Sequence, residues 1–215
     1  MTQLVDIPSP GWPLTFGEQG LPSVVLVHDD YGRLPYLESY ATALAKQGFF
    51  VVVPDLFNGI ATVDDEGVAL LRSRLDEGFA MATIDDAIDL GRGHGASRVG
   101  LIGMGLGGRL ALRSAQAGAV DAVISYYAGL AESEGGIVPC PVALHFSEFD
   151  DWGSGLDADL FVSRLKEVGT PVTRHQYIGT GTFFANATIS ATLDKNAAAL
   201  AFARSTYFMQ AQLLD

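Results

Sequence analysis

Short apolar runs of strand length alternate along the chain with longer segments in which apolar residues recur every three or four positions. Strands are predicted at residues 23–28, 49–53, 98–102, 121–127, 142–146 and 171–177. Helices are predicted at about 34–47, 67–76 and 80–91, from the glycines near 105 to about 117, and at 156–168 and 190–212. This alternation predicts an α/β fold, a three-layer sandwich whose mostly parallel central sheet is covered on both faces. The continuous β-branched runs agree with it, because parallel strands are buried on both sides.

Two stretches fall outside this alternation. Residues 1–20 are rich in proline and glycine and predict an opening antiparallel hairpin, while residues 58–66 predict a polar loop. The sequence contains no repeat, linker or low-complexity segment. We therefore expect a single domain over residues 1–215, which is long enough to bury a core.

The charge balance narrows the range of partners. The chain carries 13 lysines and arginines against 25 aspartates and glutamates, a formal net charge of -12. An acidic surface repels phosphate groups, so nucleic acid and anionic membrane are excluded, and a small-molecule ligand or substrate is expected. Cys140 is the one cysteine of the sequence, so no intrachain disulfide can form. The sequence also lacks a signal peptide pattern and a membrane-length apolar run, and we expect a cytoplasmic protein.

Ligands of parallel α/β sheets bind beyond the carboxyl ends of the strands, so the chemistry is expected there. The segments that follow the predicted strands are His28 to Tyr31, Asp55, Gly103 to Gly107, Tyr126 to Tyr127, Ser147 to Trp152, and Gly179 to Phe184.

The glycine-rich turn after residue 102 fits two motifs. Its sequence, Gly103-Met104-Gly105-Leu106-Gly107-Gly108, matches the dinucleotide pattern G-x-G-x-x-G and also a nucleophile elbow with glycine at its centre. The dinucleotide motif normally follows the first strand, whereas two parallel strands precede this turn. The elbow is favoured, no cofactor is expected, and the backbone N–H of Leu106 is a predicted oxyanion donor. The alternative is that the glycines only pack a helix against the sheet.

With this turn, the chain resembles the dienelactone hydrolase family of α/β-hydrolases over nearly its whole length. The order and spacing of six segments carry the resemblance: Val24 to Gly32, Gly48 to Phe57, Val99 to Gly108, Ser125 to Tyr127, Leu144 to Asp150, and Tyr177 to Asn186. The resemblance implies the α/β-hydrolase fold and a site built on a cysteine, a histidine and an acid.

Two of the three triad positions implied by the resemblance carry other residues. The nucleophilic cysteine falls on Gly105 and the histidine on Thr182, whereas the acid falls on Asp150. Acyl transfer needs a nucleophile activated by a base that an acid orients. Glycine has no group to attack with and threonine cannot take a proton near neutral pH. We therefore expect no ester hydrolysis by a triad.

Further family positions are altered in the same region. The family's loop glutamate falls on Asp29, and its arginine for the substrate carboxylate falls on Asn186. The loop also normally supplies a second oxyanion N–H, here predicted at Asp30. The resemblance thus implies a site that differs from the family's in both catalysis and substrate binding.

No other residue is an obvious replacement nucleophile or base. Ser147 lies near a strand end but no histidine follows at a useful place, and Cys140 precedes its strand and is expected at the opposite end of the sheet. His28 lies at the catalytic face, although most such histidines are structural. The remaining histidines are expected in a helix–strand connection, in the core and on a peripheral strand: His94, His145 and His175.

The polar residues left at the strand ends are mostly acidic. The carboxylates are Asp29, Asp30, Glu148, Asp150 and Asp151, and the expected pocket walls are Tyr31, Tyr127, Trp152 and Phe183. Clustered carboxylates raise one another's pKa, so one could serve as an acid. The alternative is a set of solvated charges and helix caps, with Asp150 and Asp151 capping the helix near residue 156. No metal is expected, because the adjacent His28, Asp29 and Asp30 rarely converge on one ion.

Three functions remain open. The favoured one is a non-hydrolytic site for cyclisation, isomerisation or elimination on a small, largely apolar carbonyl compound, with Asp150, Asp29 or His28 moving protons. The second is a pseudoenzyme that binds a ligand or partner without turnover. The third is a hydrolase with an unrecognised nucleophile such as Ser147.

Overall fold

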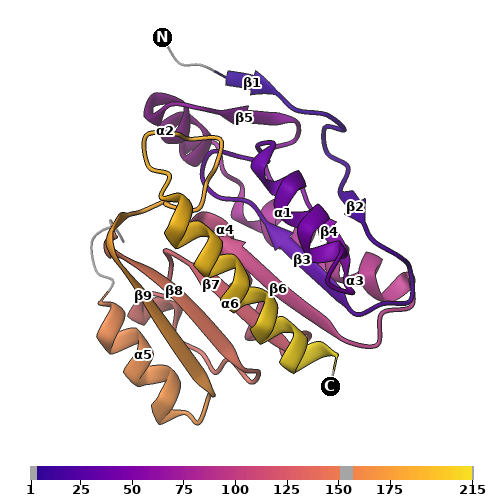
Figure 1. Cartoon of the computed structure of the whole chain (residues 1–215), viewed down its shortest axis with the longest axis vertical. Helices are drawn as coiled ribbons and strands as arrows, with labels where there is room; N and C mark the ends of the chain where they lie inside the picture. The colour runs from indigo at the N-terminus through magenta and orange to yellow at the C-terminus, as the bar shows by residue number, and fades with distance from the viewer. Residues whose placement is uncertain (1–3, 151–156, 215) are drawn as a thin grey trace. The chain divides into compact units, whose positions relative to one another are not determined.

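The computed structural model describes residues 4–150 and 157–214 and divides into two compact units, residues 1–99 and 100–215 (Figure 1). In both units, strands alternate with helices along the chain. Within the described residues, no helix combines the length and the apolar character that a bilayer crossing requires.

Three neighbouring strands of the first unit pair in mixed directions. Strand β4 (Phe50–Val53) lies between β2 (Leu14–Phe16), which is antiparallel to it, and β3 (Ser23–Val27), which is parallel to it. Every residue of β3 and β4 is buried, as their continuous apolar runs predicted. Helices α1 (Tyr36–Ala45) and α3 (Glu77–Gly93) pack on these strands.

The predicted opening hairpin is wrong. Strand β1 (Leu4–Asp6) pairs antiparallel with β5 (Ile60–Thr62), inside the segment predicted as a polar loop, and β2 pairs with β4. The guanidinium of Arg33 explains the departure, because it donates hydrogen bonds to the carbonyl oxygens of Pro8, Ser9 and Trp12. These bonds fix the segment between β1 and β2 in a position where the two strands pair with β5 and β4 and not with each other. Helix α2 (Asp65–Ser73) follows β5.

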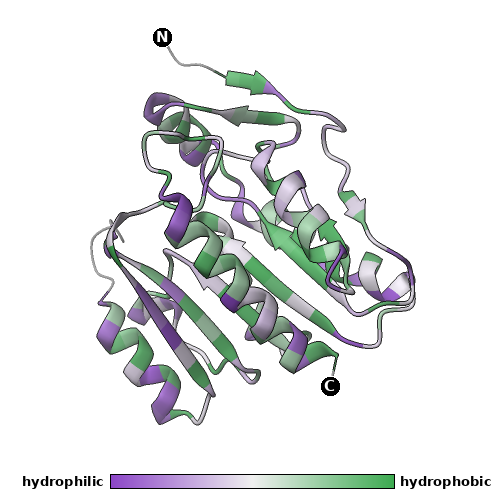
Figure 2. Cartoon of the chain, in the orientation of Figure 1, coloured by the Kyte–Doolittle hydropathy of each residue, from purple (hydrophilic) through white to green (hydrophobic). Residues whose placement is uncertain are grey.

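The second unit contains four parallel strands in the order β6, β7, β8, β9. Their bounds are Val99–Met104, Ala122–Tyr126, Val142–Phe149 and Val172–Gly181. Strand β9 forms an edge of this sheet, and Figure 2 shows its hydrophilic stretch, which discourages pairing with another chain. The helices of this unit are α4 (Leu106–Ala115), the short 3-10 helix η1 (Glu132–Glu134), α5 (Ala158–Glu167) and α6 (Lys195–Leu213).

Aspartate side chains set where four helices begin. Asp64, Asp76, Asp157 and Asp194 each accept hydrogen bonds from amides of the first turn of α2, α3, α5 and α6. The prediction that Asp150 caps the helix near residue 156 is therefore wrong, since α5 begins at Ala158 and Asp157 caps it.

A buried polar network joins α6 to the sheet of the second unit. His145 on β8 bonds through Nδ1 to the Tyr177 hydroxyl (2.7 Å) and through Nε2 to the Ser205 hydroxyl (3.1 Å). Ser205, on α6, also bonds to the hydroxyl of Tyr126 on β7 (2.7 Å). Burial, followed by the positive field of His175 and Arg204, holds the pKa of His145 well below its ordinary value. The prediction that His145 is a satisfied core residue is confirmed.

The neutral state of His145 predicts a pH-dependent stability. Below pH 6.5 an unfolded histidine binds a proton that the buried His145 does not, so the free energy of unfolding falls as the pH drops, by at most about 1.4 kcal/mol per pH unit from this group. His145→Phe removes the contribution of this residue to the pH dependence of the free energy of unfolding. Urea unfolding from pH 8 to pH 5 should therefore give a shallower loss for His145→Phe than for the unsubstituted protein. Identical slopes would show that His145 is not the responsible group, and the range above pH 7.5 serves as the internal control.

The turn between β6 and α4 brings strand and helix unusually close. A Cβ atom on Gly103 would lie 2.1 Å from the carbonyl oxygen of Gly107, and one on Gly108 would lie 2.6 Å from Oγ of Ser125. Between them, Gly105 has φ 49° and ψ -117°, a conformation that residues with a side chain rarely adopt. The glycine packing and the strained centre expected of an elbow therefore occur together in this turn.

Gly105→Ala tests the backbone strain. We expect the free energy of unfolding to fall by about 1–3 kcal/mol, because alanine is strained at these dihedral angles. Gly93→Ala is the matched control, since Gly93 lies in helix α3 with no atom near its missing Cβ. That substitution should instead raise stability by about 0.5 kcal/mol. Urea unfolding of both variants measures the two changes in the free energy of unfolding. Equal changes would show that the backbone at Gly105 places no special demand on the residue there.

Candidate functional site

The carboxyl ends of β6 to β9 form one edge of the sheet in the second unit. Gly105 follows β6, Tyr127 follows β7, Asp150 follows β8 and Thr182 follows β9. Backbone hydrogen bonds from Gly105 N to Tyr126 O and from Tyr127 N to His145 O, both 2.9 Å, continue the ladder to this edge.

Left-handed backbone conformations gather at the same edge. Tyr127 has φ 51° and Phe183 has φ 67°, in addition to φ 49° at Gly105. Such conformations cost free energy in residues other than glycine and persist where the surroundings enforce them, often at functional sites. Positive φ angles therefore follow three of the four parallel strands, which marks this edge as the candidate site.

Asp150 is the centre of a small hydrogen-bonded cluster. Its Oδ2 accepts from the Ser147 amide (2.9 Å), and its Oδ1 accepts from the Ser147 hydroxyl and from Oγ1 of Thr182 (3.2 Å). The structure thus brings together the residue predicted at the acid position and the one predicted at the histidine position, from β8 and β9. The Thr182 hydroxyl donates to the carboxylate where an imidazole would have to stand.

The two candidate nucleophiles predicted in the second unit, Ser147 and Cys140, lie in different surroundings. The Ser147 hydroxyl is directed to Asp150, and both ring nitrogens of His145 are engaged by Tyr177 and Ser205. Cys140 lies just before β8, at the amino end of the strand, and burial raises its thiol pKa to about 11. The Ser147 hydroxyl is therefore paired with a carboxylate, and the Cys140 thiol is protonated near neutral pH.

Aromatic side chains cover one side of the candidate site. The ring of Tyr127 lies 5.9 Å from that of Phe183 and 5.1 Å from that of Phe184, both edge-on. The Tyr127 hydroxyl accepts a hydrogen bond from the Ala185 amide (2.8 Å), which holds the segment after β9 against the end of β7. Two predicted wall residues, Tyr127 and Phe183, are thus in contact, while Trp152 and Asp151 lie outside the described residues.

The position implied for a carboxylate-binding arginine has a structural role in this chain. Asn186 is buried. Its backbone N–H donates to the Phe183 carbonyl oxygen (2.9 Å), and its side-chain Oδ1 accepts from the backbone N–H of Thr188 (3.0 Å). The side chain therefore stabilises the turn after Phe184.

In the first unit, His28 is bound on both sides of its ring. Its Nδ1 donates to the Asp29 carbonyl oxygen (2.8 Å) and its Nε2 accepts from the Leu56 amide (3.0 Å). Burial is the main cause that lowers the His28 pKa, so the ring is neutral. A neutral imidazole with both nitrogens bonded to backbone holds the loops after β3 and β4 together.

The three side chains that follow His28 point to different partners. Asp29 accepts from the Tyr31 amide (3.0 Å) and from the Tyr36 hydroxyl on α1 (2.9 Å). Asp30 pairs with Arg72 on α2 (2.7 Å). Tyr31 donates to Asp65, also on α2 (2.9 Å), and burial followed by this bond raises the Tyr31 pKa. The loop is thereby held between two helices.

This divergence bears on metal binding. His28, Asp29 and Asp30 direct their side chains to separate partners, and within residues 4–150 and 157–214 no three histidine, cysteine or carboxylate side chains gather as ion ligands.

Sequence reasoning missed two sets of hydrogen bonds. Ser147 and Asp150 are three residues apart at a strand end, a spacing typical of local side-chain to backbone turns, and this pattern could have revealed the cluster. The links from α2 to residues 30 and 31 join positions about 40 apart, and no local pattern signals them.

Comparison with known proteins agrees with the fold. The sequence profile of the dienelactone hydrolase family matches residues 14–213. The crystal structure of a putative dienelactone hydrolase from Klebsiella pneumoniae is similar with a TM-score of 0.76 at 18% identity, covering 100% of this chain and 98% of that one. A dienelactone hydrolase-like promiscuous phosphotriesterase from metagenomic libraries is similar with a TM-score of 0.78 at 16% identity, covering 91% of this chain and 88% of the other.

A curated relative gives a closer sequence match over a shorter stretch. The carboxymethylenebutenolidase of Rhodococcus opacus is 31% identical over 135 residues, which are 60% of this chain and 52% of that protein. The match therefore spans about half the length of that relative.

The predicted α/β fold with a mostly parallel sheet is confirmed, and the similar solved structures share this fold. Because the family profile covers nearly the whole sequence, this chain belongs to the dienelactone hydrolase family.

Proposed function

We propose that the edge formed by the ends of β6 to β9 binds a small, largely apolar carbonyl compound and transforms it without hydrolysis by a triad. The reaction class is cyclisation, isomerisation or elimination through an enolate. One observation carries the proposal: Gly105 keeps an elbow conformation without a side chain, and Thr182 donates a hydroxyl to Asp150.

The turn supplies positive potential without a nucleophile. Helix α4 begins at Leu106, directly after Gly105, and the amino end of a helix carries a partial positive charge. Such a site stabilises an oxyanion or an enolate oxygen, and in hydrolases this stabilisation is separate from the attack itself. Loss of the attacking group therefore leaves a means of polarising a carbonyl group.

The surroundings favour a neutral, apolar compound. Phe183 is partly exposed, packs on the buried Tyr127 ring and offers apolar surface. Asn186 is bound into its own turn where the family resemblance implies an arginine for a carboxylate. A substrate that lacks a carboxylate fits this set better than a charged one.

Asp150 is the group we assign to proton transfer. It ends strand β8 at this edge and accepts hydrogen bonds from two hydroxyls, those of Ser147 and Thr182. His28 and Asp29 are weaker candidates, since both nitrogens of His28 bind backbone and Asp29 binds the Tyr36 hydroxyl and the Tyr31 amide. In this assignment Asp150 takes a proton from the carbon next to the carbonyl group and later returns one.

Hydrolysis is the second candidate. The Rhodococcus relative is named a carboxymethylenebutenolidase, and the Ser147 hydroxyl in this chain contacts a carboxylate. In that case Ser147 would attack the carbonyl group with Asp150 as its only partner, an arrangement without the usual base.

Proton exchange on a neutral ketone tests the favoured function. In D2O, the protein should speed the loss of the methyl proton signal of acetophenone, and Asp150→Asn should reduce this acceleration about 100-fold, as for removal of a general base. Asp121→Asn is the matched control, because Asp121 precedes β7 at the opposite end of the strands. Equal exchange rates in all three proteins would remove the assignment of Asp150.

An activated-ester assay in parallel separates the alternatives. Turnover of 4-nitrophenyl acetate that disappears in Ser147→Ala would establish hydrolysis. Absence of both exchange and hydrolysis would leave a binding protein.

Restoring the two altered positions tests whether Asp150 is still poised as a family acid. Gly105→Cys together with Thr182→His should raise 4-nitrophenyl acetate hydrolysis at least about 10-fold above either single variant, because triad members act as a unit. Adding Asp150→Asn should remove most of the gain. A folded double variant with no gain would contradict the placement of these three residues.

A further inference from the structure

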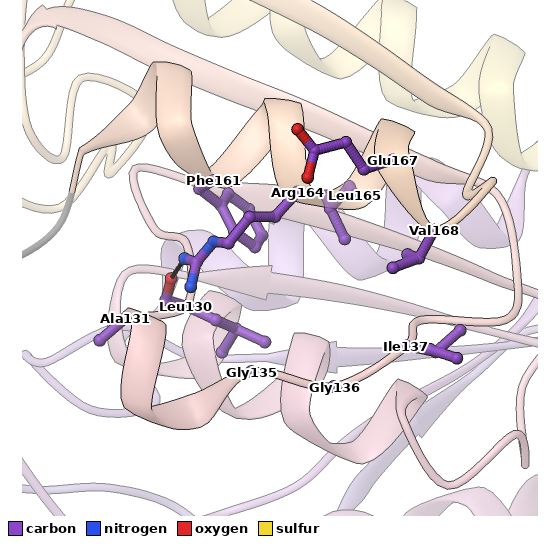
Figure 3. A pocket seen from close by; sticks show the side chains of 10 residues that line it. All are labelled: Leu130, Ala131, Gly135, Gly136, Ile137, Phe161, Arg164, Leu165, Glu167 and Val168. Carbon is purple, nitrogen blue, oxygen red and sulfur yellow. Dashed lines mark hydrogen bonds between the residues drawn. The ribbon is translucent and has the colours of Figure 1, made fainter.

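A pocket in the second unit lies between α5 and the segment from Leu130 to Ile137 (Figure 3). Its volume is about 280 Å³. Asp150, Thr182 and Gly105 are not among its lining residues, so it differs from the candidate site above.

The walls of this pocket, which we call the α5 pocket, are mainly apolar. Leu130, Phe161 and Leu165 form its buried side. At its rim, Ile137 is 59% exposed and Val168 is 48% exposed, so two large apolar side chains face water instead of the core. An apolar pocket with an apolar rim favours a ligand with a hydrocarbon part.

Arg164 is the polar group of the wall. Its Nη2 donates to the carbonyl oxygen of Leu130 (2.7 Å), and its guanidinium carbon lies 6.0 Å from the centre of the Phe161 ring. Its Nε is buried, and within the described residues it has no hydrogen-bond partner. A buried donor without an acceptor is costly and uncommon, so an acceptor that reaches this side chain would relieve the cost.

The acidic groups near the pocket do not neutralise Arg164. Glu134 pairs instead with Arg109 (2.5 Å) and accepts from the Ala131 amide (3.1 Å). Figure 3 shows the Arg164 guanidinium directed toward Leu130, while Glu167 turns its carboxylate away from that segment. Within the described part of the chain, the positive charge of Arg164 is therefore available to an anion.

The segment opposite α5 is held in place without a ligand. The Gln116 side chain donates to the Glu134 carbonyl oxygen (3.0 Å), and it passes so close to Gly136 that a Cβ there would lie 2.8 Å away. Gln116 follows the last residue of α4 and Arg109 lies in its first turn, so this contact and the Arg109–Glu134 pair together fix the wall to α4. A preformed wall lowers the entropy cost of binding.

We propose that the α5 pocket binds a small amphipathic carboxylate. The carboxylate pairs with the guanidinium of Arg164, and the hydrocarbon part lies on Phe161, Leu165 and Ile137. At roughly 30 Å³ for each water-sized group, the pocket holds about nine or ten non-hydrogen atoms, the size of a medium-chain fatty acid.

Calorimetric titration with sodium octanoate and with 1-octanol tests this assignment. Octanoate should bind the unsubstituted protein more tightly than octanol. Arg164→Gln should weaken octanoate at least about 10-fold and leave octanol within about twofold, because only the acid uses the charge. Arg92→Gln removes the same charge from the exposed face of α3 and should change neither affinity. Absence of octanoate binding, or equal binding by Arg164→Gln, would overturn the proposal.

Two further variants locate the binding. Ile137→Asp places a negative charge at an exposed rim position and should weaken octanoate at least about 10-fold, even if Arg164→Gln fails to fold. Asp150→Asn should leave octanoate affinity unchanged. Loss of binding in Asp150→Asn, or none in Ile137→Asp, would assign the ligand to another place on the protein and overturn the proposal.

Discussion

The close approach of β6 and α4 is the constraint on which the candidate site depends. Gly103 and Gly108 leave no room for a Cβ between strand and helix, so the chain must reverse direction within a few residues. The reversal puts Gly105 in a conformation suited to glycine and starts α4 at the strand end. The positive end of α4 thus faces the edge where Tyr127, Asp150 and Thr182 follow their own strands, and this placement needs no side chain at residue 105.

Sequence reasoning succeeded where the pattern was local or continuous. Buried runs such as Phe50–Val53 are determined by neighbouring residues, so the order of most strands and helices and the fold class were predictable. The opening hairpin was wrong because Arg33, far along the chain, binds the carbonyl groups of residues 8, 9 and 12. Strand β5 was missed because three residues that pair with β1 carry too short a pattern.

The candidate site was likewise predictable only in part. The positions of Gly105, Asp150 and Thr182 at strand ends followed from the order of elements, but the hydroxyl bond between Thr182 and Asp150 did not. The role of His28 depends on the Leu56 amide, in a segment 28 residues away, and that of Asp29 depends on the Tyr36 hydroxyl on the following helix. No spacing rule identifies either partner. Sequence therefore located the residues, whereas their bonding state required the coordinates.

Glycine at residue 105 also affects how the protein tolerates change. A residue with a side chain would hold this turn at a cost of about 1–3 kcal/mol, whereas glycine occupies φ 49° and ψ -117° with little strain. Natural proteins lie only slightly above the stability that function requires, so a reserve of this size can absorb one or two destabilising mutations elsewhere. Glycine in this turn therefore leaves a reserve of stability that can absorb mutations in the surrounding loops.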